Sequence, residues 1–150
     1  IKFRMVENNG HSGKEHKFSK EKLTTLMALY YFEEFPDALN IIQKIYEVGG
    51  KGHSCGIYST SDKNIDALAR VAPVSRMMVR QPQSKSNAGS WTNGMPMTSS
   101  LGCGIWGGNI TNENVTMKHM MNYTWVSKPI QEDRPSEREL FGEFFGQEVA

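Results

Sequence analysis

The 150-residue sequence predicts an α/β fold in which helices cover both faces of a mostly parallel sheet. Two observations support this prediction. Apolar runs of strand length alternate with helical segments in the order strand, helix, strand, helix, strand over residues 23–81. The first helical segment also carries apolar residues three and four positions apart, as a buried helix face does. This alternation is typical of βαβ units with parallel strands.

The N-terminal part of the chain is expected to contain a loop, a strand and a helix. Residues 7–22 are polar and form the loop, and the aromatic, apolar run 23–32 has the length of a strand. Pro36 suits the first turn of the helix, and Gly49-Gly50 can end it. The buried stripe of this helix consists of Ala38, Leu39, Ile41, Ile42, Ile45 and Tyr46.

The following segment completes the alternation. Residues 53–59 are expected to form a short strand. Ser61 is a suitable N-cap for a second helix, which Pro73 ends. Residues 76–81 form another apolar strand. The loop that follows, 82–110, is long enough to indicate a functional role.

The last third of the chain is expected to contain three short elements. Thr116 can cap a short helix that carries three methionines. Residues 123–130 read as a strand with the character of an exposed edge, and residues 135–145 as a terminal amphipathic helix.

Composition argues against several classes of function. The net charge of +1 gives no reason to expect binding to nucleic acid or to a membrane surface, and no apolar run is long enough to span a bilayer. Cys55 and Cys103 supply neither a disulfide framework nor a metal cluster, and His11 and His16 lack ligand spacing, so we expect no metal site. Such cysteine usage favours a cytoplasmic protein. Because the chain begins with isoleucine, we expect it to be a piece of a longer protein.

The most informative stretch is residues 99–109, in which four glycines surround one cysteine and one tryptophan. Such a loop suits either the wall of a narrow pocket or a tight crossing inside a core. Ligands of parallel α/β proteins bind beyond the carboxyl ends of the strands. We therefore expect this loop to meet Arg80-Gln81 and the turn 52–54 at a ligand site.

Three blocks of residues occur in a characteristic order and spacing. They are Glu21-Lys22-Leu23, then Gly50-Lys51-Gly52-His53-Ser54, then residues 100–109 followed by Glu113-Asn114-Val115 and Lys118-His119. Together they resemble the EKL, G-x-G-H-[ST] and LGCGxWGGN…ENV…KH motifs of the CoA-acylating aldehyde dehydrogenase family. The resemblance covers roughly residues 1–130 and implies the catalytic-domain fold of that family.

Within the family, residues 79–84, 93–98 and 132–137 look closest to acylating sulfoacetaldehyde dehydrogenases. The resemblance implies that residues 1–123 are the C-terminal portion of the catalytic domain. Residues 124–150 would be the oligomerisation strand and tail, through which the protein forms a homo-oligomer.

The reaction implied by the resemblance has two stages. A cysteine thiolate adds to the aldehyde, expected to be sulfoacetaldehyde, and a hydride passes to NAD or NADP. Coenzyme A then attacks the enzyme thioester and leaves as acyl-CoA. The family's nucleophile lies upstream of these blocks, and Cys103 matches a different family cysteine. The chain alone is therefore expected to be inactive.

The resemblance also gives roles to five residues of the chain. Glu21 would bind the hydroxyls of the nicotinamide ribose, since a carboxylate accepts hydrogen bonds from a diol. His53 would carry a proton for the CoA thiol or interact with the thiohemiacetal. The acyl pocket would be lined by Gly102, Cys103 and Gly104. Without the resemblance, Glu21 is a surface acid and His53 satisfies backbone groups at the start of a strand.

By the same resemblance, Arg80 replaces the uncharged residue that is usual in acetaldehyde-handling relatives. Its planar guanidinium suits an anionic group such as sulfonate, which predicts a substrate-binding role. An ion pair with Asp62 is the alternative.

Two other functions remain open at this point. The chain could be a non-catalytic binding or assembly module of the same fold. It could also belong to an acylating dehydrogenase for succinate semialdehyde or acetaldehyde.

Overall fold

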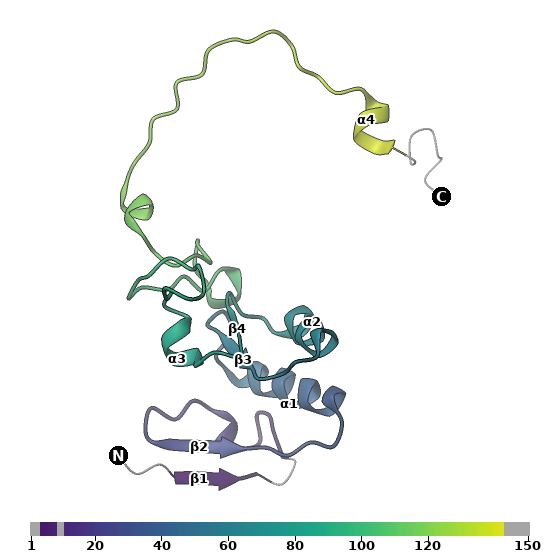
Figure 1. The fold of residues 1–150 in the computed structure, drawn as a ribbon, viewed down its shortest axis with the longest axis vertical. Coiled ribbons are helices and arrows are strands. Elements are labelled where there is room, and N and C mark those ends of the chain that lie inside the picture. The colour runs from purple at the N-terminus through teal and green to yellow at the C-terminus, as the bar shows by residue number, and fades with distance from the viewer. Residues whose placement is uncertain (1–3, 9–10, 143–150) are drawn as a thin grey trace. The chain divides into compact units, whose positions relative to one another are not determined.

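The computed structural model describes residues 4–8 and 11–142, and the chain divides into two compact units, residues 1–120 and 121–150. The described strands all lie in the first unit (Figure 1). The strands are β1 (Arg4–Glu7), β2 (Leu26–Leu29), β3 (Cys55–Ile57) and β4 (Met77–Val79). The first unit also contains the helices α1 (Phe35–Val48), α2 (Asp62–Val71) and α3 (Gln83–Ser86). The predicted α/β class is confirmed.

The strands pair in parallel, as predicted, but they form two separate pairs instead of one sheet. β1 pairs with β2, and β3 pairs with β4 in the register Cys55 to Met77. The sequence analysis did not predict β1. Because β2 takes β1 as its neighbour, only β3, α2 and β4 close into a βαβ unit. Helix α1 lies between the two pairs (Figure 1).

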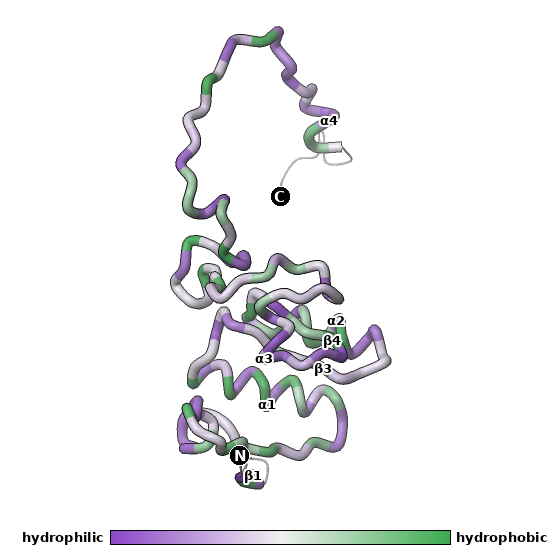
Figure 2. Tube along the Cα trace, turned by 60° about the vertical axis from the view of Figure 1, so that its left-hand side comes forward, coloured by the Kyte–Doolittle hydropathy of each residue, from purple (hydrophilic) through white to green (hydrophobic). Residues whose placement is uncertain are grey.

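Helix α1 begins and ends close to the predicted positions. Glu34 and Asp37 form a reciprocal capping box at its start, and the Gly49 N–H donates to the Ile45 carbonyl at its end. Hydrophobic and hydrophilic residues alternate along the helix (Figure 2). Its apolar residues pack against the core of β3, α2 and β4, which is formed by Ile57, Leu68 and Ala72.

The N-cap predicted for α2 is confirmed. The Ser61 hydroxyl accepts a hydrogen bond from the Asn64 N–H at 3.4 Å, which satisfies a free donor of the first turn. Leu68 of the same helix is only 2% exposed and lies in the core with Ile57 and Ala72.

The segment after β4 is more ordered than predicted. The expected loop 82–110 contains α3 and a 3-10 turn at Ile105–Gly107. The expected helix with three methionines is a second 3-10 turn, Met117–Met120. Thr116 directly precedes this turn, and its carbonyl accepts a hydrogen bond from the His119 N–H at 3.0 Å. The Thr116 N–H donates to the Nδ1 atom of His119 at 2.9 Å, so the imidazole also closes the turn.

In the second unit, the expected strand 123–130 does not form among the described residues. A strand needs a hydrogen-bonded neighbour, and the described part of the chain offers none for this segment. The expected helix 135–145 is the shorter α4 (Glu137–Phe141), capped by Ser136 and Glu139. The rest of that prediction lies outside the described residues.

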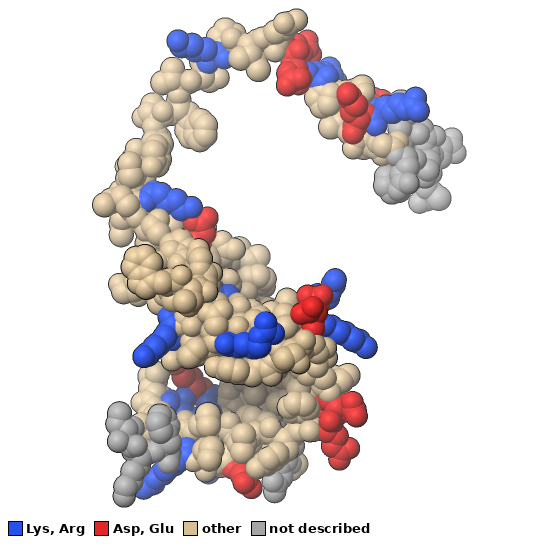
Figure 3. Space-filling model, in the orientation of Figure 1, with Lys and Arg blue, Asp and Glu red and all other residues tan. Residues whose placement is uncertain are grey.

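Charges of both signs are mixed over the visible face of the first unit (Figure 3). Among residues 4–8 and 11–142, no helix combines the length and apolar character needed to cross a membrane. Within the same ranges, no group of three or more His, Cys, Asp or Glu side chains is placed to hold a metal ion.

Candidate active-site cleft

Glu21 and His53, which belong to different sequence blocks, line the same cavity of about 490 Å³. The segment before β2 brings Glu21, and the turn before β3 brings His53. The end of α1 and the start of α3 complete the walls. The structure therefore brings these two predicted site residues together.

The loop that carries Glu21 is anchored by the buried side chain of Ser19. The buried hydroxyl of Ser19 accepts a hydrogen bond from the Gly13 N–H at 3.0 Å and lies 3.3 Å from the Tyr30 hydroxyl. Glu21 itself is exposed, and its carboxylate accepts no hydrogen bond from the described residues. The carboxylate is thus available to a ligand in the cavity.

The turn that carries His53 is fixed by backbone hydrogen bonds on both sides. The Gly52 N–H donates to the Pro73 carbonyl at 2.7 Å, and the Cys55 N–H donates to the Arg76 carbonyl at 3.0 Å. The His53 side chain is exposed. A rigid turn thus presents a solvent-accessible imidazole.

Cys103 meets His53 on this turn. Its Sγ atom lies 3.6 Å from Nδ1 of His53, and the cysteine is only 8% exposed. The two chain segments cross so closely that a Cβ atom on Gly52 would lie 2.5 Å from the Cys103 carbonyl oxygen. The glycine-rich loop is therefore a tight crossing, as one of the two interpretations held, and it lies directly beside the cleft histidine.

The loop closes on itself through residues 100–104 and 111–115. The N–H groups of Gly102 and Gly104 donate to the carbonyls of Glu113 and Thr111, both at 2.9 Å. A Cβ atom on Gly102 would lie 2.2 Å from the Thr111 oxygen, so this approach requires glycine. Gly102, Cys103 and Gly104 are all buried.

Arg76 joins the loop to the turn, and the sequence analysis gave it no role. Its Nε donates to Asn114 Oδ1 at 2.6 Å, and Nη1 donates to the His53 carbonyl at 3.4 Å. Its Nη2 donates to the carbonyls of Gly102 and Asn112 at 2.8 and 3.2 Å. Arg76 is 5% exposed, and burial lowers its pKa. The feature of the sequence that could have indicated this role is a basic residue directly before the apolar strand β4.

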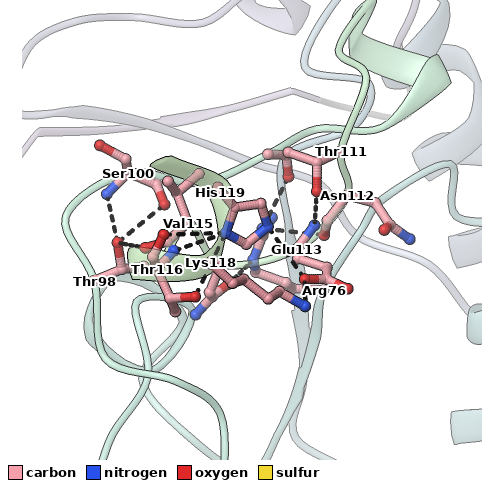
Figure 4. A network of polar contacts seen from close by, with 12 residues as sticks. Arg76, Thr98, Ser100, Thr111, Asn112, Glu113, Val115, Thr116, Lys118 and His119 are labelled. Carbon is pink, nitrogen blue, oxygen red and sulfur yellow. Dashed lines mark hydrogen bonds and ion pairs between the residues drawn. The ribbon is translucent and has the colours of Figure 1, made fainter. Parts of the chain in front are cut away.

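A polar cluster next to Arg76 consists of Glu113, Lys118 and His119 (Figure 4). Lys118 pairs with the Glu113 carboxylate, and His119 Nε2 lies 3.2 Å from the same oxygen. The hydrogen bond and charge of Lys118 lower the pKa of Glu113. The cluster braces the segment that carries Asn114.

Helix α3 closes the cleft beside His53 with two amide side chains. Gln83 Nε2 donates to the carbonyl of Ser54 at 2.8 Å and to its hydroxyl at 3.0 Å. Asn87 Nδ2 donates to the same hydroxyl at 3.2 Å. Sequence reasoning missed both amides, because their spacing carried no recognisable motif.

Arg80 lies apart from the other predicted site residues. It follows β4 and its N–H donates to Ile57 at the end of β3, whereas His53 precedes β3, so the two lie at opposite ends of this strand pair. Arg80 lines a separate cavity of about 600 Å³ with residues 58–60 and donates from Nη1 to the Ser59 carbonyl at 2.8 Å. The described residues contain no ion pair between Arg80 and Asp62.

The chain is similar to aldehyde dehydrogenases over most of its length, although no family model matches it. It is 42% identical over 144 residues to a sulfoacetaldehyde dehydrogenase of Acholeplasma, covering 96% of this chain and 30% of the relative. It is 35% identical over 132 residues to an acetylating succinate-semialdehyde dehydrogenase of Clostridium kluyveri, covering 87% of this chain and 29% of that relative.

A solved structure shows the same fold. The acetylating aldehyde dehydrogenase of Geobacillus thermoglucosidasius matches with a TM-score of 0.78 at 34% identity, over 91% of this chain and 30% of that one. The chain thus spans about 30% of the length of these two curated relatives. Its sequence and fold place it in the acylating aldehyde dehydrogenase family.

Proposed function

We propose that the chain acts as the C-terminal part of an oxidoreductase that converts an aldehyde, CoA and NAD(P)+ into acyl-CoA and NAD(P)H. The observation that carries the proposal is the shared cavity of Glu21 and His53. The similarity to acylating aldehyde dehydrogenases supports the same activity.

Glu21 fits the part proposed for it, because its exposed carboxylate accepts no hydrogen bond from the described residues. In the proposed enzyme it binds the two hydroxyls of the nicotinamide ribose and orients the ring. The bound NAD or NADP supplies the hydride acceptor.

His53 is the proposed proton carrier for the CoA thiol. Its Nδ1 faces the sulfur of Cys103, and its Nε2 has no hydrogen-bond partner among the described residues. In the tautomer whose Nδ1–H donates to the sulfur, that second nitrogen is free to accept the thiol proton when CoA attacks. The nucleophilic cysteine of this proposal lies outside the chain, and Gly102, Cys103 and Gly104 form a wall of the acyl pocket.

The proposed aldehyde is sulfoacetaldehyde, and Arg80 is the proposed recognition site for its sulfonate. The guanidinium is exposed, forms no ion pair among the described residues and keeps Nε and Nη2 free of protein hydrogen bonds there. Arg80 and His53 lie at opposite ends of the β3–β4 pair, and only one methylene separates the sulfonate from the reacting carbonyl carbon. The role of Arg80 is therefore proposed separately from that of His53 and is tested by itself. A carboxylate would suit the same guanidinium, which makes succinate semialdehyde the second candidate.

Residues 1–123 are proposed to be the C-terminal portion of the catalytic domain. Residues 124–150 are proposed to bind a partner subunit. Residues 123–130 have no strand neighbour in the described structure, and they expose large side chains, with Trp125 at 94%. An unpaired segment of this kind can add to the sheet edge of a second copy.

The test is an assay of the complete protein that contains this chain. NADH or NADPH formation is measured with sulfoacetaldehyde, succinate semialdehyde or acetaldehyde, with and without CoA. We expect CoA-dependent formation that is fastest with sulfoacetaldehyde. Absence of CoA-dependent formation with all three aldehydes would favour the alternative, a non-catalytic module of the same fold.

A further inference from the structure

Arg76 is a buried cation that is bound almost entirely by neutral groups. Its three nitrogens donate to three backbone carbonyls and one amide oxygen, and no carboxylate among the described residues pairs with it. Burying a guanidinium without a counter-ion is costly unless its donors are satisfied. The positions of the four acceptors show which segments this side chain connects.

One acceptor is the carbonyl of His53, and the other three belong to the two segments that flank the loop of Cys103. Gly102 directly precedes Cys103, and Asn112 and Asn114 lie on the strand-like partner of this loop. Arg76 thus sets the distance between the turn of His53 and the loop of Cys103. The result of that placement is the 3.6 Å contact between Cys103 Sγ and His53 Nδ1.

Asn114 extends this clamp to the next layer. It is 5% exposed, and while its Oδ1 accepts from Arg76, its Nδ2 donates to the carbonyls of Asn87 and Pro96 at 3.2 and 2.8 Å. Asn87 in turn contacts the Ser54 hydroxyl next to His53. The turn that carries the imidazole is therefore held on both sides, at His53 and at Ser54.

We propose that Arg76 is a positioning residue for His53: it clamps the loop of Cys103 to the turn of His53, so that the thiol fixes the imidazole through Nδ1 and leaves Nε2 for proton transfer. This inference rests on the proposed function, in which His53 carries a proton. Arg76 itself touches neither substrate nor cofactor in this arrangement.

The kinetic test is a double-mutant cycle in the complete protein. Arg76→Lys keeps the charge but cannot span the four acceptors, and a misplaced imidazole should lower kcat by roughly 10- to 100-fold without changing KM for NAD(P)+. In the His53→Ala background the same substitution should change kcat by less than about twofold, because the group it positions is gone. Effects that multiply in the cycle would overturn the inference. Arg70→Lys, at an exposed position of α2, is the matched control and should retain wild-type kcat.

A second measurement tests the clamp independently of catalysis. Alkylation of Cys103 should be at least several-fold faster in Arg76→Lys than in wild type or Arg70→Lys, because the loop no longer holds the thiol against His53. Unchanged alkylation would overturn the clamp even in a protein without dehydrogenase activity. A protein with altered alkylation and no CoA-dependent turnover would instead contradict the proposed function alone. If Arg76→Lys does not fold, Asn114→Ala, which removes the 2.6 Å acceptor, enters the same cycle and the same alkylation assay.

Discussion

The sulfur of Cys103 lies 3.6 Å from Nδ1 of His53, although the two residues are 50 positions apart in the chain. The contact depends on Gly52, where any side chain would collide with the Cys103 backbone. Histidine, cysteine and glycine thus form one structural unit at the rim of the cleft. This unit joins the second and third sequence blocks, residues 50–54 and 100–109, at one site.

Replacing Glu21 with glutamine should weaken cofactor binding. The amide accepts hydrogen bonds from ribose hydroxyls less well than the carboxylate, and a charged hydrogen bond contributes about 1.5–3 kcal/mol. We expect KM for NAD(P)+ in the complete protein to rise by roughly tenfold or more. Glu15→Gln, at an exposed position of the same loop, is the control. Equal KM values for the two variants would show that Glu21 does not bind the ribose.

Replacing Arg80 with alanine should discriminate between aldehydes. Loss of the guanidinium should lower kcat/KM for sulfoacetaldehyde by about tenfold or more, because a charged hydrogen bond to the sulfonate is removed. The value for acetaldehyde, which carries no charge, should stay close to wild type. Arg80→Lys should lie between the two, since it keeps the charge without the planar donors. A parallel loss for both aldehydes would remove Arg80 from substrate recognition.

The backbone of Arg80 predicts a separate effect on stability. Its φ is +52°, in the left-handed region that disfavours residues with a Cβ atom. We expect Arg80→Gly to be more stable to unfolding than Arg80→Ala by about 1 kcal/mol, measured by denaturant titration. Both variants lack the guanidinium, so their comparison isolates the backbone. Equal stability would mean that this conformation stores no strain.

Replacing Gly102 with alanine should destabilise the loop beside His53. The new Cβ would lie 2.2 Å from the Thr111 oxygen, a backbone atom that cannot rotate away. Overpacking of this kind costs about 1–3 kcal/mol, which should appear as a lower Tm of the complete protein. Gly49→Ala is the matched control, because its Cβ would meet no atom within 4 Å. A Tm for Gly102→Ala equal to that of the control would contradict the crossing.

Cys55 predicts a pH dependence of stability. Burial raises the pKa of its thiol from 9.0 to about 11, partly offset by a hydrogen bond with Tyr46. Between these values the folded protein keeps a proton that the unfolded chain has lost, so the free energy of unfolding should fall as pH rises through this window. Burial raises the pKa of Tyr46 as well, so the informative quantity is the difference from Cys55→Ala. Urea titrations should show a shallower decline for that variant, and identical slopes would contradict the buried thiol.

The local sequence pattern was sufficient to predict the helices whose ends carry capping residues. The N-cap of α2 at Ser61 and the end of α1 at Gly49 follow from capping chemistry that acts within one turn. The strands β3 and β4 follow from short apolar runs, and the motif blocks identified Glu21 and His53. These features depend on residues close together in the chain.

The tertiary structure decided which distant segments of the chain contact one another. It separated the strands into two pairs, left residues 123–130 without a strand neighbour in the described chain, and placed Arg80 at the far end of β3 and β4 from His53. It also buried Arg76, an otherwise ordinary basic residue, between the turn of His53 and the loop of Cys103, which lie 50 positions apart in the chain. The sequence by itself determined the limits of α1 and α2 and the α/β class, because each depends on local spacing, while the family resemblance indicated Glu21 and His53. Strand partners and the Arg76 clamp depend on hydrogen bonds across the fold, and no local spacing encodes them.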